Sequence, residues 1–363
     1  MLKIPNRDFT LKGFRDFLIE RESHAKDLKV YNLWTKFDQW GARDEPYSLA
    51  AKFAARQFNL TLHGEIMEIT AFRGPEEEYD DNPVKYYAHL YENGILQVYT
   101  FAESKQADKI LADVVGESGI YYLWLGPPSI DKLRKIILSS RPSARLMIFA
   151  GKRSRFSALP SNIRPNHNRT INYIGSDADE ALEELRSAYG VIPIALRFQV
   201  SGSVDFWVDS HGTFTFLSGK LAHLFDFVET AIELAREAKR AVENTKLEKV
   251  STPQSQGKYS SLRVVPLQVN LTKELSAKEG DVLVEQLTNN NFMVYNKTVT
   301  HGSFRMEATV VDTKKKTFFS LGVLQDRIVI LPRDETQFDS FLRLISTLEE
   351  FDPDLSFAPM EGP

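Results

Sequence analysis

The stretch SDADEALEELRSAYGVIPIALRFQVSGSVDFWVDSHGTFTFLSGKLAHLFDFVETAIELAREAKRAVE (residues 176–243) decides the fold. Ser176 can cap a helix that Gly190 ends, because a hydroxyl accepts from free amides of the first turn and glycine accepts a left-handed backbone. Runs of aromatic and β-branched residues follow, separated by turn residues, and predict three strands at Val191–Val200, Val204–Val208 and Thr213–Leu217.

From residue 221 the apolar residues recur with a helical period, at Leu221, Leu224, Phe225, Val228 and Ile232. This spacing predicts a long amphipathic helix that covers one face of the small sheet. The stretch as a whole therefore predicts a unit of one helix, several antiparallel strands and a second helix.

The same order of helix, strands and helix is predicted twice more, over residues 48–115 and 276–348. Each unit contains a His-Gly pair, and the third opens with Ser276 and Glu279, which are spaced as a capping box. We therefore predict an α+β protein of several units, with small antiparallel sheets each backed by helices, and a possible divergent triplication. A small strand-helix-strand insert, residues 120–149, stands between the first two units.

A chain of 363 residues is longer than the chains that usually fold around a single hydrophobic core, so we predict two or three modules. We place an N-terminal helical segment and the first unit in residues 1–116, and the insert and the central unit in 117–250. The third unit fills 251–363. The polar stretch from Val250 to Ser261 has no apolar pattern and is predicted to be a linker or a long loop.

The composition excludes several classes of protein. The chain has no cysteine, which removes disulfides, thiol nucleophiles and the common structural zinc sites. Its first 20 residues mix charged and apolar side chains too closely for a signal peptide, and no apolar run approaches the length of a membrane span. We expect a soluble cytoplasmic protein without a membrane partner.

Positive charge is concentrated in the insert and the loop after it. Residues 131–169 contain ten Lys or Arg against one acid, Asp131, so they carry +9 in a chain whose net charge is −4. The cations are Lys132, Arg134, Lys135, Arg141, Arg145, Lys152, Arg153, Arg155, Arg164 and Arg169. We call residues 131–169 the basic segment.

Such a local excess predicts an anionic partner, and phosphate backbones are the usual one because bound cations release condensed counterions. Arginine predominates, which favours DNA or RNA, since a guanidinium binds phosphate in bidentate fashion and stacks on bases. The predicted nucleic-acid-binding residues are Lys152, Arg153, Arg155, Phe156, Arg164, His167 and Arg169. The alternatives are that these cations pair with the protein's own carboxylates, contact a protein partner, or cover a solvated face.

No sequence motif points to chemistry, so no catalytic residue and no cofactor is predicted. His63, His211 and His301 could supply one metal ligand per unit, but no second ligand stands near any of them, and turns beside glycine explain them. No metal is predicted. Acids at residues 177, 179 and 180 fit the first turn of a helix better than a magnesium site.

Three functions remain open. The first is a non-catalytic nucleic-acid-binding or scaffolding protein that contacts the phosphate backbone through the basic loop. The second is a nuclease, or a nuclease subunit, whose active site no motif marks. The third is a module that binds a ligand or another protein. A turn of three lysines, Lys314 to Lys316, beside Asp312 is a further place where a phosphate could be touched.

Overall fold

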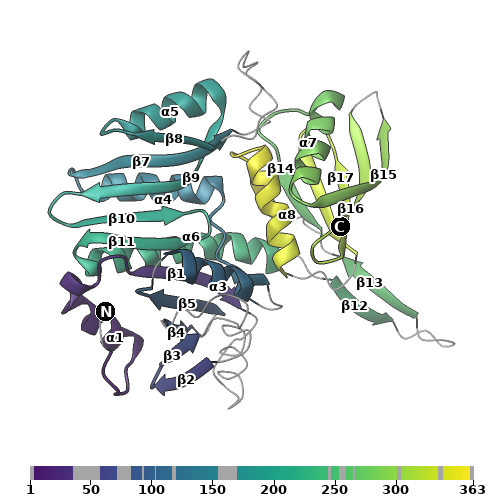
Figure 1. The fold of residues 1–363 in the computed structure, drawn as a ribbon. Coiled ribbons are helices and arrows are strands. Elements are labelled where there is room, and N and C mark those ends of the chain that lie inside the picture. The colour runs from purple at the N-terminus through teal and green to yellow at the C-terminus, as the bar shows by residue number, and fades with distance from the viewer. Residues whose placement is uncertain are drawn as a thin grey trace.

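The computed structural model describes residues 4–35, 58–71, 83–91, 94–102, 104–116, 120–153, 170–243, 247–252, 259–264, 266–300, 304–333 and 338–359 (Figure 1). Within these ranges the chain forms seven α-helices and antiparallel sheets, which confirms the α+β class. Residues 48–57, with which the first predicted unit opens, and most of the loop of the basic segment lie outside the described residues.

An 11-stranded sheet forms the larger lobe, with strand order β2-β3-β4-β5-β1-β11-β10-β9-β7-β8 and β6 paired to β1. Its strands are β1 (Lys29–Thr35), β2 (Phe58–His63), β3 (Ile66–Ala71), β4 (Val84–Leu90), β5 (Ile95–Thr100), β6 (Ile120–Tyr122), β7 (Ala144–Arg153), β8 (Thr170–Ile174), β9 (Val191–Val200), β10 (Val204–Asp209) and β11 (Thr213–Gly219).

Strand β1 joins the strands of the first and second predicted units into one sheet. It lies between β5 and β11, pairs with both, and is buried at every position. Its apolar and aromatic residues explain this place, because a central strand is covered on both faces. The first and second predicted units therefore share one sheet, although a module boundary is predicted between them at residue 116. The triplication and the division into three modules stay predictions.

The helices that accompany this sheet are α1 (Leu11–Ile19), α3 (Ser104–Gly116), α4 (Pro127–Ser140), α5 (Ala178–Tyr189) and α6 (Leu221–Glu243). Helix α6 begins and packs as predicted, with Leu221, Leu224 and Val228 fully buried. Gly190 ends α5 with φ of 62°, as predicted, but Asp177 rather than Ser176 is the N-cap.

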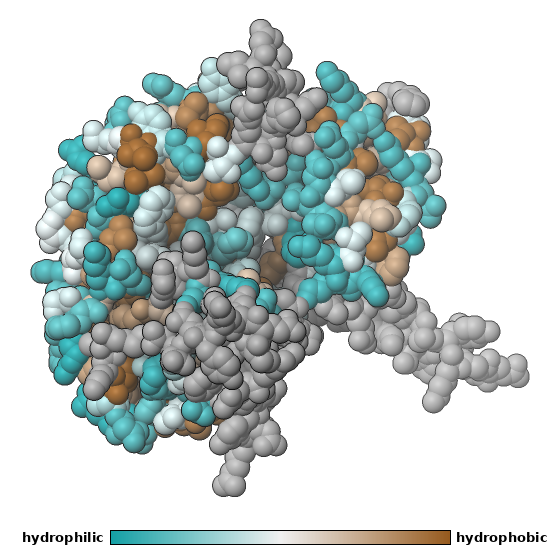
Figure 2. Space-filling view, viewed as in Figure 1, coloured by the Kyte–Doolittle hydropathy of each residue, from teal (hydrophilic) through white to brown (hydrophobic). Residues whose placement is uncertain are grey.

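The strands of the central unit alternate between a buried and a half-exposed side. Along β10 the inward residues Val204, Phe206 and Val208 are buried, because helices cover that face. The opposite face is turned toward the viewer in Figure 1, and in Figure 2 it is a mixture of hydrophobic and hydrophilic patches. Period-two burial of this kind is what an antiparallel sheet with one covered face requires.

The second lobe is a two-layer unit built on a 6-stranded sheet with order β15-β16-β17-β18-β14-β19. Its elements are β14 (Leu267–Asn270), α7 (Ala277–Asn289), β15 (Phe292–Thr300), β16 (Arg305–Asp312), β17 (Thr317–Val323), β18 (Arg327–Pro332), α8 (Phe338–Phe351) and β19 (Ser356–Pro359). The predicted capping box of Ser276 and Glu279 starts α7. Both helices lie on one face of the sheet, where Phe319 packs against Phe341 at 5.6 Å.

A two-stranded hairpin lies between the lobes in sequence, formed by β12 (Leu247–Thr252) and β13 (Tyr259–Val264). The predicted linker, Val250 to Ser261, therefore contains strand at both of its ends. Propensity missed these strands because their residues are mostly polar, and the ladder hydrogen bonds depend on pairing rather than on burial.

Helix α8 stands between the two sheets and connects the lobes (Figure 1). Trp124 Nε1 donates to Glu349 Oε2 at 2.9 Å, Lys152 pairs with Glu350, and Arg186 pairs with Asp354. All three larger-lobe partners come from the segment between β6 and β9. None of the helices within the described ranges is long and apolar enough to cross a membrane.

Candidate nucleic-acid interface

The structure describes seven of the ten cations of the basic segment. Lys132, Arg134 and Lys135 lie on α4, and Arg141 follows that helix. The other three, Arg145, Lys152 and Arg153, lie on β7. Arg155, Phe156, Arg164, His167 and Arg169 fall outside the described residues.

Arg134 is a structural residue. Its side chain is 2% exposed and reaches Asp131 at 2.9 Å, and it also pairs with Asp179 and Glu183 of α5. Five guanidinium donors allow one arginine to serve several carboxylates at once. Burial alone would raise the pKa of Asp131, but a hydrogen bond from Lys135 and the charges of Arg134 and Arg186 lower it. This cluster holds α4 against α5.

Lys152 and Arg153 lie together at the end of β7, but each already contacts the protein. Lys152 Nζ pairs with Glu350 of α8, with 24% of the lysine side chain exposed. Arg153 Nε donates to the carbonyl of Tyr189 at 3.1 Å. The alternative of internal pairing therefore holds for Arg134, Lys135 and Lys152, whereas Arg145 is exposed and has no ion pair among the described residues.

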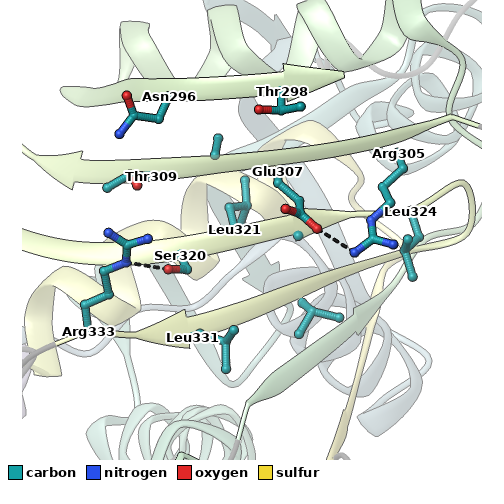
Figure 3. Close-up of a pocket in the computed structure, with 13 residues that line it drawn as sticks. Asn296, Thr298, Arg305, Glu307, Thr309, Ser320, Leu321, Leu324, Leu331 and Arg333 are labelled. Atoms are coloured by element: carbon teal, nitrogen blue, oxygen red, sulfur yellow. Dashed lines mark hydrogen bonds and ion pairs between the residues drawn. The ribbon is translucent and has the colours of Figure 1, made fainter. Parts of the chain in front are cut away.

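A second candidate surface lies on the other lobe, on the face of the C-terminal sheet that α7 and α8 leave uncovered. A hollow of ≈ 520 Å³ opens there across four strands, β15 to β18 (Figure 3). Its lining includes Asn296, Thr298, Arg305, Glu307, Thr309, Ser320, Gly322, Leu324, Val329, Leu331 and Arg333. We call this surface the outer face.

Strand register places three exposed apolar side chains on the outer face. Tyr295 is paired with Thr309 and Thr309 with Ser320, and both of these partners line the hollow. Phe318 and Met293 lie two residues from Ser320 and Tyr295, so they point to the same side. Met293, Tyr295 and Phe318 are 44%, 46% and 41% exposed.

Cations lie near Phe318. Arg333 donates to Ser320 Oγ at 2.5 Å, and its backbone N–H donates to the carbonyl of Phe318 at 3.1 Å. Lys314 and Lys316 are exposed in the turn between β16 and β17, and neither forms an ion pair within the described ranges. Of the lining residues Glu307 alone is acidic, and Arg305 pairs with it at 2.5 Å.

The lysine turn is held from inside the protein. Asp312 is fully buried, and its Oδ1 accepts from the backbone N–H of Lys314 at 2.9 Å and of Lys315 at 3.3 Å. Arg343 of α8 donates to both carboxylate oxygens. The acid next to the three lysines is therefore neutralised from the interior, and its charge does not oppose theirs at the surface.

Two of the predicted His-Gly pairs are described, and in both the glycine has a positive φ, 65° at Gly64 and 74° at Gly212. His63 is buried on β2 with Nε2 3.4 Å from Glu68. The ring of His211 contacts that of Tyr122 at a tilt of 40°, with the ring centroids 4.5 Å apart. His301 lies outside the described residues. Of the acids at the start of α5, Asp177 accepts from Tyr173 at 2.8 Å and Asp179 pairs with Arg134. Within the described ranges no three His, Asp or Glu side chains gather as metal ligands.

The sequence indicates the lysine turn as a possible phosphate contact, but it does not predict the exposed apolar side chains of the outer face. In β15 apolar residues occupy both sides, Phe292 and Val294 on one and Met293 and Tyr295 on the other, so the pattern does not tell which side is covered. Only the packing of α7 and α8 decides it.

Comparison with known proteins finds similarity over the centre of the chain and beyond it. Residues 129–211 match the model of the middle domain of the AF_0896_M family. Over 285 residues the chain is 23% identical to an uncharacterized protein of Archaeoglobus fulgidus, with 75% of this chain and 76% of that protein covered. The family match runs from α4 to the turn after β10, and so contains the basic segment and the buried Arg134 cluster. Residues 129–211 are thus the part of this chain that is similar to that family's middle domain.

Proposed function

We propose that the protein binds nucleic acid without catalysis, through phosphate contacts made by exposed cations. The observation that carries the proposal is the lysine turn: Lys314 and Lys316 are exposed in the turn that joins β16 and β17, two of the strands that line the hollow, while the neighbouring Asp312 is buried against Arg343. Exposed cations without a local carboxylate attract polyanions, because each phosphate that they neutralise releases counterions.

The basic segment supplies a second set of contacts in this proposal. Arg155, Arg164 and Arg169 carry the excess charge of its loop, and Phe156 and His167 offer rings to exposed bases. Lys152 and Arg153 stand where that loop begins, on β7. Because Lys152 already pairs with Glu350, it must leave that carboxylate to reach a phosphate.

Fluorescence anisotropy with labelled single-stranded DNA, duplex DNA and RNA, repeated over a series of salt concentrations, tests this function. Affinity should fall as salt rises. The double variant Lys314→Glu and Lys316→Glu should weaken binding and reduce the slope of log K against log salt by roughly 1.5. Affinity that does not depend on salt, or no binding at low salt, would overturn the proposal.

The matched control is Lys12→Glu with Lys26→Glu, which changes the net charge equally at two exposed lysines of the larger lobe. This control should leave the slope near that of the wild type. A triple variant, Arg155→Glu, Arg164→Glu and Arg169→Glu, separates the loop of the basic segment from the outer face. Equal losses in the control and in both variants would mean that only net charge matters.

A scaffolding function has one observation in its favour. Strand β8 is at the edge of the main sheet, and Ile174 at its end is 77% exposed. An open edge strand can accept another strand from a partner. Sedimentation of the wild type and of Ile174→Lys distinguishes this function, since an assembly formed through β8 should dissociate in the variant.

A further inference from the structure

We infer that the nucleic acid bound at the outer face is single-stranded, with bases stacked on Tyr295 and Phe318. The inference rests on the proposed function, which asks only for phosphate contacts. It adds the class of polynucleotide and the side chains that distinguish it.

Exposed apolar side chains are concentrated on this face. Six large hydrophobic residues are at least 41% exposed within the described ranges, and three of them lie on one face of one sheet: Met293 and Tyr295 on β15, and Phe318 on β17. Register pairs Met293 with Val311 and Val311 with Phe318, which makes a continuous apolar row across β15, β16 and β17. Contiguous exposure of this kind marks an interaction surface, whereas isolated exposed residues do not.

The spacing of the two rings suits stacked bases. Tyr295 on β15 is separated from Phe318 on β17 by the strand β16, and Phe318 is two residues along β17 from the position in register with Tyr295. Their Cα atoms are therefore roughly 12 Å apart. At that distance the rings do not stack on each other, and each can offer a face to a separate base. Bases in a duplex hide their faces inside the helix, so only an unpaired strand can use both rings.

Positively charged side chains on the outer face lie where the phosphate backbone would run beside the stacked bases. Arg333 directly follows β18, and its backbone N–H donates to the carbonyl of Phe318. Lys314 and Lys316 lie in the turn, one residue pair beyond Val311 and Phe318 along the strands. Glu307 is four residues along β16 from Val311 and is paired with Arg305. The surface around Phe318 is therefore bordered by positive charge, which complements phosphate.

The hollow beside this row offers polar groups to the edges of a base. Asn296, Thr298, Thr309 and Ser320 line it, and their side chains both donate and accept hydrogen bonds (Figure 3). Gly322 contributes depth, since it has no side chain. A volume of ≈ 520 Å³ falls within the ~300–1,000 Å³ of small-ligand sites, which is enough for one nucleotide.

The test compares an oligo(dT) single strand with a duplex of equal length, for the wild type and for Tyr295→Ala with Phe318→Ala. The single strand should bind more tightly to the wild type. The double variant should lower single-strand affinity by about 30-fold or more, because each stacked base contributes ~1–3 kcal/mol. Its salt slope should not change, since no phosphate contact is lost.

Two further variants serve as controls for the loss of the aromatic rings. Tyr295→Phe retains the ring and should keep most of the affinity, while Leu62→Ala removes an exposed side chain, 53% accessible, from β2 of the other lobe and should have no effect. Ultraviolet crosslinking to oligo(dT), followed by mass spectrometry, should give crosslinked peptides that contain β15 or β17. The circular dichroism spectrum of each variant shows that its fold is intact.

The outcomes separate the two proposals. Absence of any binding overturns the proposed function together with this inference. Salt-dependent binding that is equal for single strand and duplex, and that survives Tyr295→Ala with Phe318→Ala, overturns the inference and leaves the function standing. Binding lost only in the triple arginine variant of the basic segment places the nucleic acid there and likewise overturns the inference.

Discussion

Arg343 on α8 binds both carboxylate oxygens of Asp312, with its Nη1 2.6 Å from each. The same carboxylate accepts from the backbone N–H groups of Lys314 and Lys315 in the lysine turn. An ion pair between the fully buried Asp312 and the half-buried Arg343 thus fixes the conformation of a turn in which Lys314 and Lys316 are exposed. The stability of the C-terminal lobe and the exposed position of Lys314 and Lys316 therefore both depend on the ion pair between Arg343 and Asp312.

Replacing Arg343 with methionine should lower the free energy of unfolding by about 3–5 kcal/mol, because it leaves the fully buried Asp312 without its counter-charge. Urea denaturation measures this loss. Arg327→Met is the matched control, since Arg327 pairs with Asp326 at the surface and should lose less than about 1 kcal/mol. Adding Asp312→Asn to Arg343→Met should restore part of the loss, and no recovery would contradict this account.

Arg134 should matter for folding rather than for binding. Arg134→Met removes the shared partner of Asp131, Asp179 and Glu183, and should lower the free energy of unfolding by about 3–5 kcal/mol. Lys135→Met, on the exposed side of the same helix, should lower it by less than about 1 kcal/mol. Equal effects of the two variants in urea denaturation would show that Arg134 is not the centre of the cluster.

The contact between the lobes should depend on pH through Glu349. Burial raises the pKa of Glu349 to about 7, against an ordinary value of 4.5, although the hydrogen bond from Trp124 lowers it. The folded protein then favours the protonated carboxyl. The stability that this group provides is complete below about pH 4.5 and is lost as pH rises to about 7, by about 3 kcal/mol in total.

Glu349→Gln keeps the acceptor for Trp124 and removes the titration. Between pH 5 and pH 8 the wild type should therefore lose about 2.5 kcal/mol of stability relative to the variant, as measured by urea denaturation at both pH values. Glu20→Gln changes an exposed carboxyl, 71% accessible, and should show no such difference. A constant gap between Glu349→Gln and the wild type would mean that Glu349 titrates normally in the folded protein.

Lys152 provides a further test, because its charge already has a partner. Lys152→Met should lower the free energy of unfolding by about 1–3 kcal/mol, since Glu350 would keep only its hydrogen bonds from Gln286 and Asn290. Nucleic-acid affinity, measured by anisotropy, should change less than in Lys314→Glu with Lys316→Glu. A larger loss of affinity in Lys152→Met would place this lysine in the interface instead.

The amino-acid pattern by itself determined much of the local structure. Gly190 ended α5, the stripe from Leu221 to Ile232 formed α6, and Ser276 with Glu279 opened α7. Each of these features depends on residues within a few positions of one another, where backbone sterics, hydrogen bonding to free amides and helical periodicity decide the outcome. The α+β class followed from their sum.

Tertiary structure alone decided which charges are available. Arg134 and Arg145 look alike in the basic segment, yet one is buried among three carboxylates brought in by neighbouring elements and the other is exposed. The same holds for Tyr295, whose exposure depends on α7 and α8 covering the opposite face of the sheet. Pairing and burial are set by contacts between residues distant in sequence, and no local pattern of residue types records them.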